Sequence, residues 1–211
     1  MTMTVMAARH VTGRGRVLRV AVVGDKQVGK TSLVTRYSHD VFSPHYTYTQ
    51  GGDLENVDVT INDKNVHVTI VDAAGHRYVR SLIKTLYRDV QGILVVYDVT
   101  RRATFDSVQE WIRQIELVNT SSPVIFMVGN KQDLTSHRCV PEEEAQFHSE
   151  RHSVPYYETS ARTGHNVTET FSALLRQAWQ HTTPSYVALD NIRLTTHNHE
   201  QEKDNSCCSI T

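Results

Sequence analysis

Residues Gly24 to Ser32 read Gly-Asp-Lys-Gln-Val-Gly-Lys-Thr-Ser, and the apolar run Leu18-Arg19-Val20-Ala21-Val22-Val23 precedes them directly. This stretch has the spacing G-x-x-x-x-G-K-[ST], in which a buried strand leads into a glycine-rich loop and a helix leaves it. Backbone N–H groups in such a loop converge on phosphate oxygens at the helix N-terminus. The sequence therefore predicts a nucleoside phosphate site. The alternative is a chance glycine turn before a helix.

The positions of this loop have distinct expected roles. Gly24 and Gly29 let the backbone wrap the β-phosphate, and the Lys30 ammonium bridges the β- and γ-phosphates. The Thr31 hydroxyl is an expected ligand for Mg²⁺. The predicted phosphate-binding residues are Gly24, Asp25, Lys26, Gln27, Val28, Gly29, Lys30, Thr31 and Ser32.

Length, charge and cysteine content limit the class of protein. The chain has 211 residues and a formal net charge of −1, so it is long enough for one domain plus tails. It lacks the basic excess that nucleic-acid binding leaves, and nucleic acid is therefore not an expected partner. Three cysteines, Cys139, Cys207 and Cys208, give no disulfide framework and fit a reducing compartment.

Apolar runs of strand length alternate with longer stretches of helical spacing. This alternation predicts an α/β fold with a six-stranded, mostly parallel sheet and helices on both faces. The expected strands are Leu18–Val23, Val57–Ile61, Val66–Ile70, Gly92–Tyr97, Val124–Val128 and Val154–Tyr157, with a hairpin turn at Asn62-Asp63-Lys64-Asn65. The expected helices cover 32–38, the apolar stripe from Phe105 to Ile115, and 166–180, and Trp111 and Trp179 are expected to pack in the core.

The domain is expected to span residues 18–180. Residues 1–17 lack the apolar core of a signal peptide, and we expect a flexible arm there, with an organelle transit peptide as the alternative. Residues 181–211 are polar and without periodicity, so we expect a disordered tail. The sequence contains no apolar run of about eighteen residues, the length that spans a membrane.

A second motif indicates which base the bound nucleotide carries. Asn130-Lys131-Gln132-Asp133 follows an apolar strand, and the Asp133 carboxylate can accept both N1–H and the exocyclic amino group of guanine, a donor pair that adenine lacks. Asn130 and Lys131 are expected to brace this loop. The segment Glu158-Thr159-Ser160-Ala161-Arg162 is placed to offer the Ala161 N–H to guanine O6. GTP and GDP are therefore the predicted ligands, and an ATP-using protein is the alternative.

With both motifs in register, the chain resembles the Ras superfamily of small GTPases over Leu18 to Gln180, and within it the Rab family. The resemblance implies a P-loop small GTPase G domain that hydrolyses GTP to GDP and phosphate. Asp72-Ala73-Ala74-Gly75 matches D-T-A-G, which implies that Asp72 holds Mg²⁺ through water and that the Gly75 N–H meets the γ-phosphate. By the same resemblance, Thr49 closes over Mg²⁺ in the GTP state, Phe42 meets the guanine ring and Tyr46 caps the phosphates.

The similarity to Rab proteins rests on three features. Thr49-Gln50-Gly51-Gly52-Asp53-Leu54 is similar to T-I-G-x-D-F, and Val95-Val96-Tyr97-Asp98-Val99-Thr100 is similar to L-V-Y-D-I-T. Trp111 is the third. The resemblance implies an exchange factor, a GTPase-activating protein, a prenyl-binding chaperone and effectors as partners, all reading the two nucleotide-sensitive switches.

The chain departs from the family at the position that orients the attacking water, where His76 replaces glutamine. A neutral imidazole donates or accepts one hydrogen bond at a time, whereas an amide does both, so we expect slow intrinsic hydrolysis. Alternatively, a partner supplies a glutamine in trans. Lys26 stands where relatives have glycine or serine, and it either crowds an arginine finger, leans toward the γ-phosphate, or points into solvent. Further departures in the switches are Gln50, Arg77, Val79 and Leu86.

These features support two hypotheses of different class. In the first, the protein is a GTPase switch with Lys30, Thr49 and His76 as its catalytic residues. In the second, it is a scaffold that holds GTP and hydrolyses it negligibly.

The chain ends Cys207-Cys208-Ser209-Ile210-Thr211, which also satisfies C-a-a-X, so we expect prenylation at the cytoplasmic face of an endomembrane or the plasma membrane, with a cytosolic pool. One lipid anchors only marginally, and Arg193 and Lys203 are too few to form a polybasic patch. Two geranylgeranyl groups on Cys207 and Cys208 therefore fit better than one farnesyl. An unmodified end is the alternative.

Overall fold

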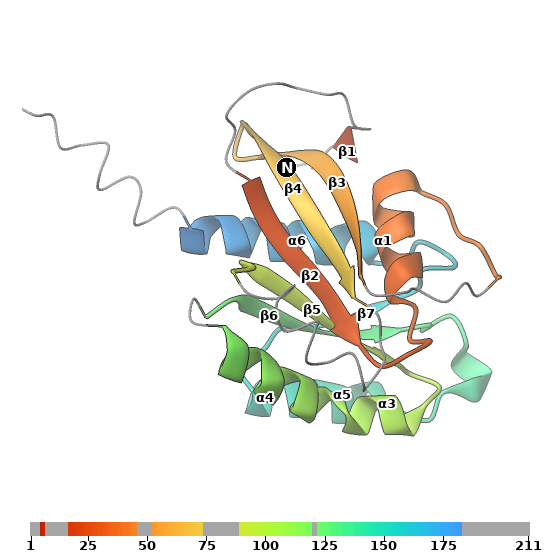
Figure 1. The fold of residues 1–211 in the computed structure, drawn as a ribbon. Coiled ribbons are helices and arrows are strands. Elements are labelled where there is room, and N and C mark those ends of the chain that lie inside the picture. Colours follow the sequence, from red (N-terminus) through yellow and green to blue (C-terminus); the bar gives the residue numbers. More distant parts are fainter. Residues whose placement is uncertain (1–4, 7–16, 46–51, 74–88, 120–121, 183–211) are drawn as a thin grey trace, which may run out of the picture.

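The structure is a computed structural model that describes residues 5–6, 17–45, 52–73, 89–119 and 122–182. One twisted sheet forms its middle layer, and helices cover both faces (Figure 1). This arrangement confirms the predicted α/β class.

The sheet has the strand order β1-β3-β4-β2-β5-β6-β7. Its central strand β2 pairs in parallel with β4 and β5, β5 pairs in parallel with β6, and β6 with β7, whereas β3 runs antiparallel to β4. The bounds are β2 Val17–Gly24, β3 Gly52–Ile61, β4 Lys64–Ala73, β5 Gly92–Asp98, β6 Val124–Asn130 and β7 Tyr156–Thr159. These are the six predicted strands, with ends that differ by a few residues.

A seventh, two-residue strand lies within the segment where we expect an arm. This strand, β1 Val5–Met6, pairs antiparallel with β3, Val5 opposite Val59. It extends one edge of the sheet without changing the order of the six predicted strands.

The hairpin between β3 and β4 has a two-residue turn. Ile61 lies opposite Lys64, and the turn residues Asn62 and Asp63 have φ values of 49° and 60°. Both values lie in the left-handed region that the favoured hairpin turns require and that Asn and Asp tolerate. The turn chemistry in the sequence therefore fixes the register of this pair.

The helices are α1 Lys30–His39, α3 Arg102–Asp106, α4 Val108–Val118, α5 Glu142–Arg151 and α6 Val167–Thr182, with a 3-10 turn η2 at Thr135–His137. The stripe expected as one helix from Phe105 is split into α3 and α4 at Ser107. Helix α5 was not predicted, because only Ala145 and Ser149 of this helix are buried and its apolar periodicity is faint. The signal that the sequence offered for this helix is three consecutive glutamates, Glu142, Glu143 and Glu144, which favour a helical first turn.

Two apolar layers hold the helices on the sheet. On one face α1 and α6 meet, where the rings of Tyr37 and Phe171 stack with centroids 4.3 Å apart. On the other face α3, α4 and α5 cover the sheet, and Figure 1 shows them on the side opposite α6. Trp179 belongs to the first layer and Trp111 to the second, as the packing prediction requires.

This topology gathers the predicted motifs at one edge. The parallel strands β2, β4, β5, β6 and β7 all end on the same side of the sheet, so the loops that follow them converge there. Among the described residues, no helix is long and apolar enough to cross a bilayer.

Candidate nucleotide-binding site

The loop between β2 and α1 has a backbone path that only glycine permits at two positions. Gly24 has φ 142°, and a Cβ there would lie 2.1 Å from the carbonyl oxygen of Val96. Gly29 has φ 95°, and its Cβ would lie 2.3 Å from Asn130 Nδ2. Both distances are far below van der Waals contact, so the two glycines let this loop pack against β5 and β6.

Lys30 folds its ammonium group back over the loop. Its Nζ donates to the carbonyl oxygens of Gly24 at 3.2 Å and Asp25 at 2.9 Å. Burial lowers the pKa of Lys30 to about 8, although the carboxylates of Asp72 and Asp25 act in the opposite direction. The site therefore holds a poorly solvated cation, which an anionic ligand would stabilise.

Thr31 and Asp72 meet at the end of β4. The Thr31 hydroxyl donates to Asp72 Oδ2 at 2.5 Å, and Asp72 is 3% exposed. Burial raises the pKa of the Asp72 carboxyl, a shift that the hydrogen bond from Thr31 and the charge of Lys30 reduce. Among the described residues, Asp72 Oδ1 is buried without a hydrogen-bond partner. A hydroxyl and an unsatisfied carboxylate oxygen are the hard donors that suit Mg²⁺, so these residues fit the predicted ion.

The predicted base-reading loop is tied to the phosphate loop. Asn130 Nδ2 donates to the carbonyl oxygen of Val28 at 2.8 Å, and Lys131 Nζ donates to that of Gln27 at 2.9 Å. Lys131 also forms an ion pair of 2.6 Å with the buried Asp98. The two motifs lie more than a hundred positions apart in sequence, and the fold brings them into direct contact.

Asp133 is oriented by the segment that follows β7. The Ser160 hydroxyl, fully buried, donates to Asp133 Oδ1 at 2.6 Å. The Ala161 N–H, which we expect to face guanine O6, donates to Asn130 Oδ1 at a long 3.3 Å in this structure. Asn130, Asp133, Ser160 and Ala161 thus form one connected group.

Phe42 and Arg162 are two further predicted nucleotide-binding residues that the structure describes. Phe42 is half-buried against the core layer of α1 and α6. Arg162 is exposed, and its carbonyl oxygen accepts from Arg36 Nη2 at 3.0 Å. Arg36 was not among the predicted site residues, although its Nε also donates to the carbonyl oxygen of Ala161 at 2.9 Å.

Two further contacts on the phosphate loop were not predicted. Trp111 Nε1 donates to Asp25 Oδ1 at 3.1 Å, and Arg101 Nη1 donates to the carbonyl oxygen of Lys26 at 3.3 Å. Trp111 was expected to pack in the core and was counted among the features shared with Rab proteins, but no contact with the phosphate loop was predicted for it. No local sequence pattern indicates that two residues 86 positions apart, Trp111 and Asp25, will form a hydrogen bond.

Several predicted site residues fall outside the described parts of the chain. They are the switch residues Tyr46, Thr49, Gly75 and His76, the departures Gln50, Arg77, Val79 and Leu86, and the lipidation candidates Cys207 and Cys208. The structure therefore brings together the loop Gly24–Ser32, Asp72, and the two base-reading segments.

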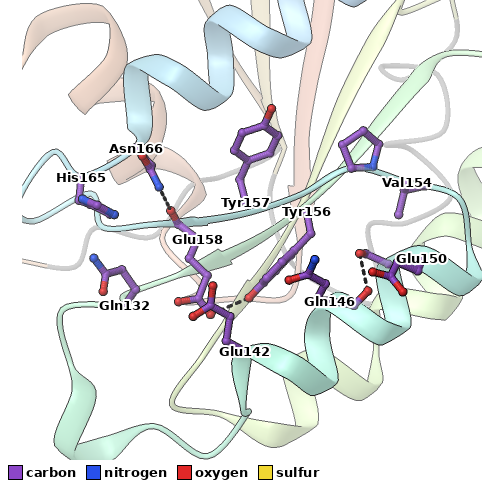
Figure 2. A pocket seen from close by; sticks show the side chains of 12 residues that line it. Gln132, Glu142, Gln146, Glu150, Val154, Tyr156, Tyr157, Glu158, His165 and Asn166 are labelled. Atoms are coloured by element: carbon purple, nitrogen blue, oxygen red, sulfur yellow. Dashed lines mark hydrogen bonds between the residues drawn. The ribbon is translucent and has the colours of Figure 1, made fainter.

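A separate cavity of about 520 Å³ lies between α5 and β7 (Figure 2). Tyr156 donates its hydroxyl proton to Glu158 Oε1 at 2.6 Å, and Asn166 Nδ2 donates to the carbonyl oxygen of Glu158 at 3.0 Å, as Figure 2 shows. Arg138 completes this group with a bidentate pair to Glu158 at 2.7 and 2.6 Å. None of the residues 24–32 lines this cavity, so it is distinct from the phosphate site.

Comparison with known proteins identifies relatives over the whole domain. The Ras family model matches residues 19–180. Human Ras-related protein Rab-37 is 33% identical over 198 residues, which cover 91% of this chain and 86% of the relative. Ras-related protein RABA5c of Arabidopsis thaliana is 32% identical over 206 residues, 93% of this chain and 96% of the relative.

Proposed function

This chain belongs to the Ras family of small GTPases and is similar to Rab proteins, and from that premise we propose that it is a membrane-anchored GTP/GDP switch. The observation that carries the proposal is the junction of the two motifs, where Asn130 and Lys131 hold the phosphate loop at Val28 and Gln27. A ligand that fills this junction presents its phosphates to one loop and its base to the other.

Guanine is the base that the arrangement supports. Ser160 fixes the Asp133 carboxylate through one oxygen, so its direction is set before a ligand arrives. A fixed carboxylate discriminates by its acceptors, because guanine offers two adjacent donors on this edge and adenine does not. The family resemblance assigns Phe42 to the guanine ring, and the position of Ala161 just after β7, beside Asn130, supports the assignment of its N–H to guanine O6.

The proposed reaction is in-line attack of water on the γ-phosphate. Lys30 supplies the fixed positive charge toward the β- and γ-phosphoryl oxygens. Thr31 and Asp72 would hold Mg²⁺, with Thr49 as a further ligand, and the ion would neutralise charge on the phosphates. His76 is the residue at the water-positioning place, so we propose a low intrinsic rate.

A second candidate is a GTP-bound scaffold that hydrolyses negligibly. Two residues favour it, since His76 replaces the glutamine and Lys26 is an exposed cation on the phosphate loop. Bulk and charge at Lys26 would oppose an arginine finger from an activator. The two candidates share the nucleotide and differ only in turnover.

We also propose the partners and the membrane attachment of this switch. The switch regions would recruit an exchange factor, a GTPase-activating protein and effectors, and prenyl groups on Cys207 and Cys208 would anchor the chain to an endomembrane or the plasma membrane. A prenyl-binding chaperone would maintain the cytosolic pool. Regulation of intracellular vesicle traffic is the role that the Rab resemblance supports.

The direct test is the nucleotide that purified protein releases on denaturation. The expected result is about one GDP or GTP per chain, because the poorly solvated Lys30 cation and the two joined motifs would favour a tightly held nucleotide. Chromatography of the supernatant separates guanine from adenine nucleotides and diphosphate from triphosphate. An adenine nucleotide would overturn the proposal, and predominantly GTP would favour the scaffold over the switch.

A further inference from the structure

Four consecutive residues of the phosphate loop, Asp25–Val28, are each held by a side chain from elsewhere in the fold. Asn130 and Lys131 hold the carbonyl oxygens of the last two, and these donors belong to the base-reading motif. The first two are held by Trp111 and Arg101, which belong to neither nucleotide motif. This half of the loop is thus supported from the β5–α4 side.

Trp111 is the more rigid of these two supports. It is 3% exposed and packs in the core layer with Val108, Ile112 and Ile115 of the same helix. The indole ring is therefore fixed by packing on several sides, and its single N–H donor has a set direction. Arg101 instead reaches the loop through a long side chain and a 3.3 Å contact.

The acceptor is a carboxylate in a loop that is expected to surround a polyphosphate. The carbonyl oxygen of Asp25 also accepts a hydrogen bond from Lys30 Nζ at 2.9 Å, and the negative charge of its carboxylate favours the charged form of Lys30. A carboxylate that is free to turn toward the phosphates would repel them and compete for Lys30. The hydrogen bond from Trp111 Nε1, 3.1 Å long, fixes the Asp25 carboxylate toward α4.

We propose that Trp111 is a positioning residue for nucleotide binding, acting through Asp25. It holds the Asp25 carboxylate against α4, and it thereby leaves Lys30 available to the phosphates. This role rests on the proposed guanine-nucleotide site and adds to it a residue outside the nucleotide motifs. A conformational change in α4 that moves Trp111 would therefore alter the rate at which the nucleotide dissociates.

The test removes the indole N–H and keeps an aromatic ring. In Trp111→Phe, methylanthraniloyl-GDP is expected to dissociate about five- to tenfold faster, the size of one typical hydrogen bond. In an Asp25→Ala background the same substitution should cause no further acceleration, because no carboxylate is left to repel the phosphates or to compete for Lys30. Stopped-flow displacement with excess GDP measures all four rates.

Trp179→Phe is the matched control, because Trp179 packs in the opposite core layer and the chemical change is identical. It should leave the dissociation rate unchanged. It also leaves Trp111 as the chain's single tryptophan, since the sequence contains two. Asp25→Ala in this background should then shift the Trp111 emission spectrum, a readout that a purely structural packing role would not give.

The outcomes separate the two claims. If Trp111→Phe releases the GDP probe no faster than Trp179→Phe does, or if Trp111→Phe accelerates release equally with and without the Asp25 carboxylate, the positioning role is wrong while the nucleotide site stands. If the Trp179→Phe protein is folded by circular dichroism and binds no GDP probe, the proposed function and the role of Trp111 both fail. Should Trp111→Phe not fold, Asp25→Glu keeps the carboxylate but moves it relative to Trp111 Nε1, and faster release of the GDP probe is again expected, whereas an unchanged rate would overturn the role.

Discussion

Lys30 is a titratable group whose charge the site controls. Burial lowers its pKa to about 8 in the protein without ligand, and phosphate oxygens around Nζ would raise it again. At about pH 8.5 most of the free protein would therefore carry neutral Lys30, and GDP binding would take up a proton. Near pH 6.5 Lys30 is already charged, so no uptake by this group is expected.

Titration calorimetry in two buffers of different ionisation enthalpy measures this uptake. We expect roughly half a proton or more per GDP at the higher pH and close to none at the lower. Equal uptake at both values would contradict the assignment of Lys30 as the phosphate-binding cation.

In the proposed switch, His76 would limit the rate of GTP turnover. His76→Gln restores a group that accepts from and donates to the attacking water at the same time, and the intrinsic hydrolysis rate should rise by about ten- to a hundredfold. GDP affinity should stay nearly constant, since the change acts on positioning. Single-turnover hydrolysis of bound GTP, without an activator, measures the rate. An unchanged rate would show that position 76 does not limit hydrolysis.

The phosphate loop depends on its glycines as an element. A methyl group in Gly29→Ala would stand 2.3 Å from Asn130 Nδ2 and force apart the bond between Asn130 and Val28. We expect GDP affinity to fall by at least about a hundredfold and unfolding to become easier by about 2–4 kcal/mol.

Gly164→Ala is the matched control for this substitution. Gly164 also has a positive φ, 84°, but the nearest atom to its Cβ is Arg36 Cδ at 3.8 Å. Its cost should be about 1 kcal/mol of backbone strain, with GDP affinity preserved. Calorimetric GDP titration and urea unfolding of both variants compare them, and equal losses of affinity would rule out the steric explanation.

Strand β7 is joined to the segment after the base-reading loop by Arg138 and Glu158. Burial acts to raise the pKa of Glu158, but the hydrogen bonds from Arg138 and Tyr156 outweigh it and hold the pKa below the ordinary value of 4.5. A lowered carboxyl pKa contributes stability above the unfolded value, and this contribution is lost as the pH falls below about 4.5.

Glu158→Gln should therefore destabilise the GDP-bound protein by about 1–3 kcal/mol at neutral pH and by progressively less in acid. Glu144→Gln is the control, because Glu144 makes an equally short bidentate pair with Arg102 on the exposed surface, where little effect is expected. Urea unfolding between about pH 3.5 and 7 at fixed excess GDP gives both profiles. A pH-independent difference for Glu158→Gln would refute the linkage.

At the scale of the whole molecule, hydrophobic patterning predicted the sheet well and the contacts between motifs poorly. The runs Gly92–Tyr97 and Val124–Val128 were recognisable because parallel strands are apolar on both faces. Helix α5 was missed because it buries only Ala145 and Ser149, and the break at Ser107 has no proline or glycine to mark it. Periodicity reports burial, so elements with little burial leave little trace in the sequence.

The candidate site was predictable where spacing carries the chemistry, as in the loop Gly24–Ser32 and in Asn130–Asp133. The joining contacts were not. Arg36 reaches Ala161, and Trp111 reaches Asp25, across more than eighty positions in each case. Such contacts follow from the packing of α1 and α4 on the sheet, and a single sequence gives no local sign of which side chains will meet.

The central claim is that the fold joins a phosphate loop to a carboxylate that reads guanine. Its most direct test is a calorimetric titration of nucleotide-free protein with GTP and with ATP, each with Mg²⁺, alongside Asp133→Asn with xanthosine triphosphate. We predict that GTP binds at least about a thousandfold more tightly than ATP, and that Asp133→Asn moves the preference toward the xanthosine nucleotide. Equal affinity of the unaltered protein for GTP and ATP would contradict the claim.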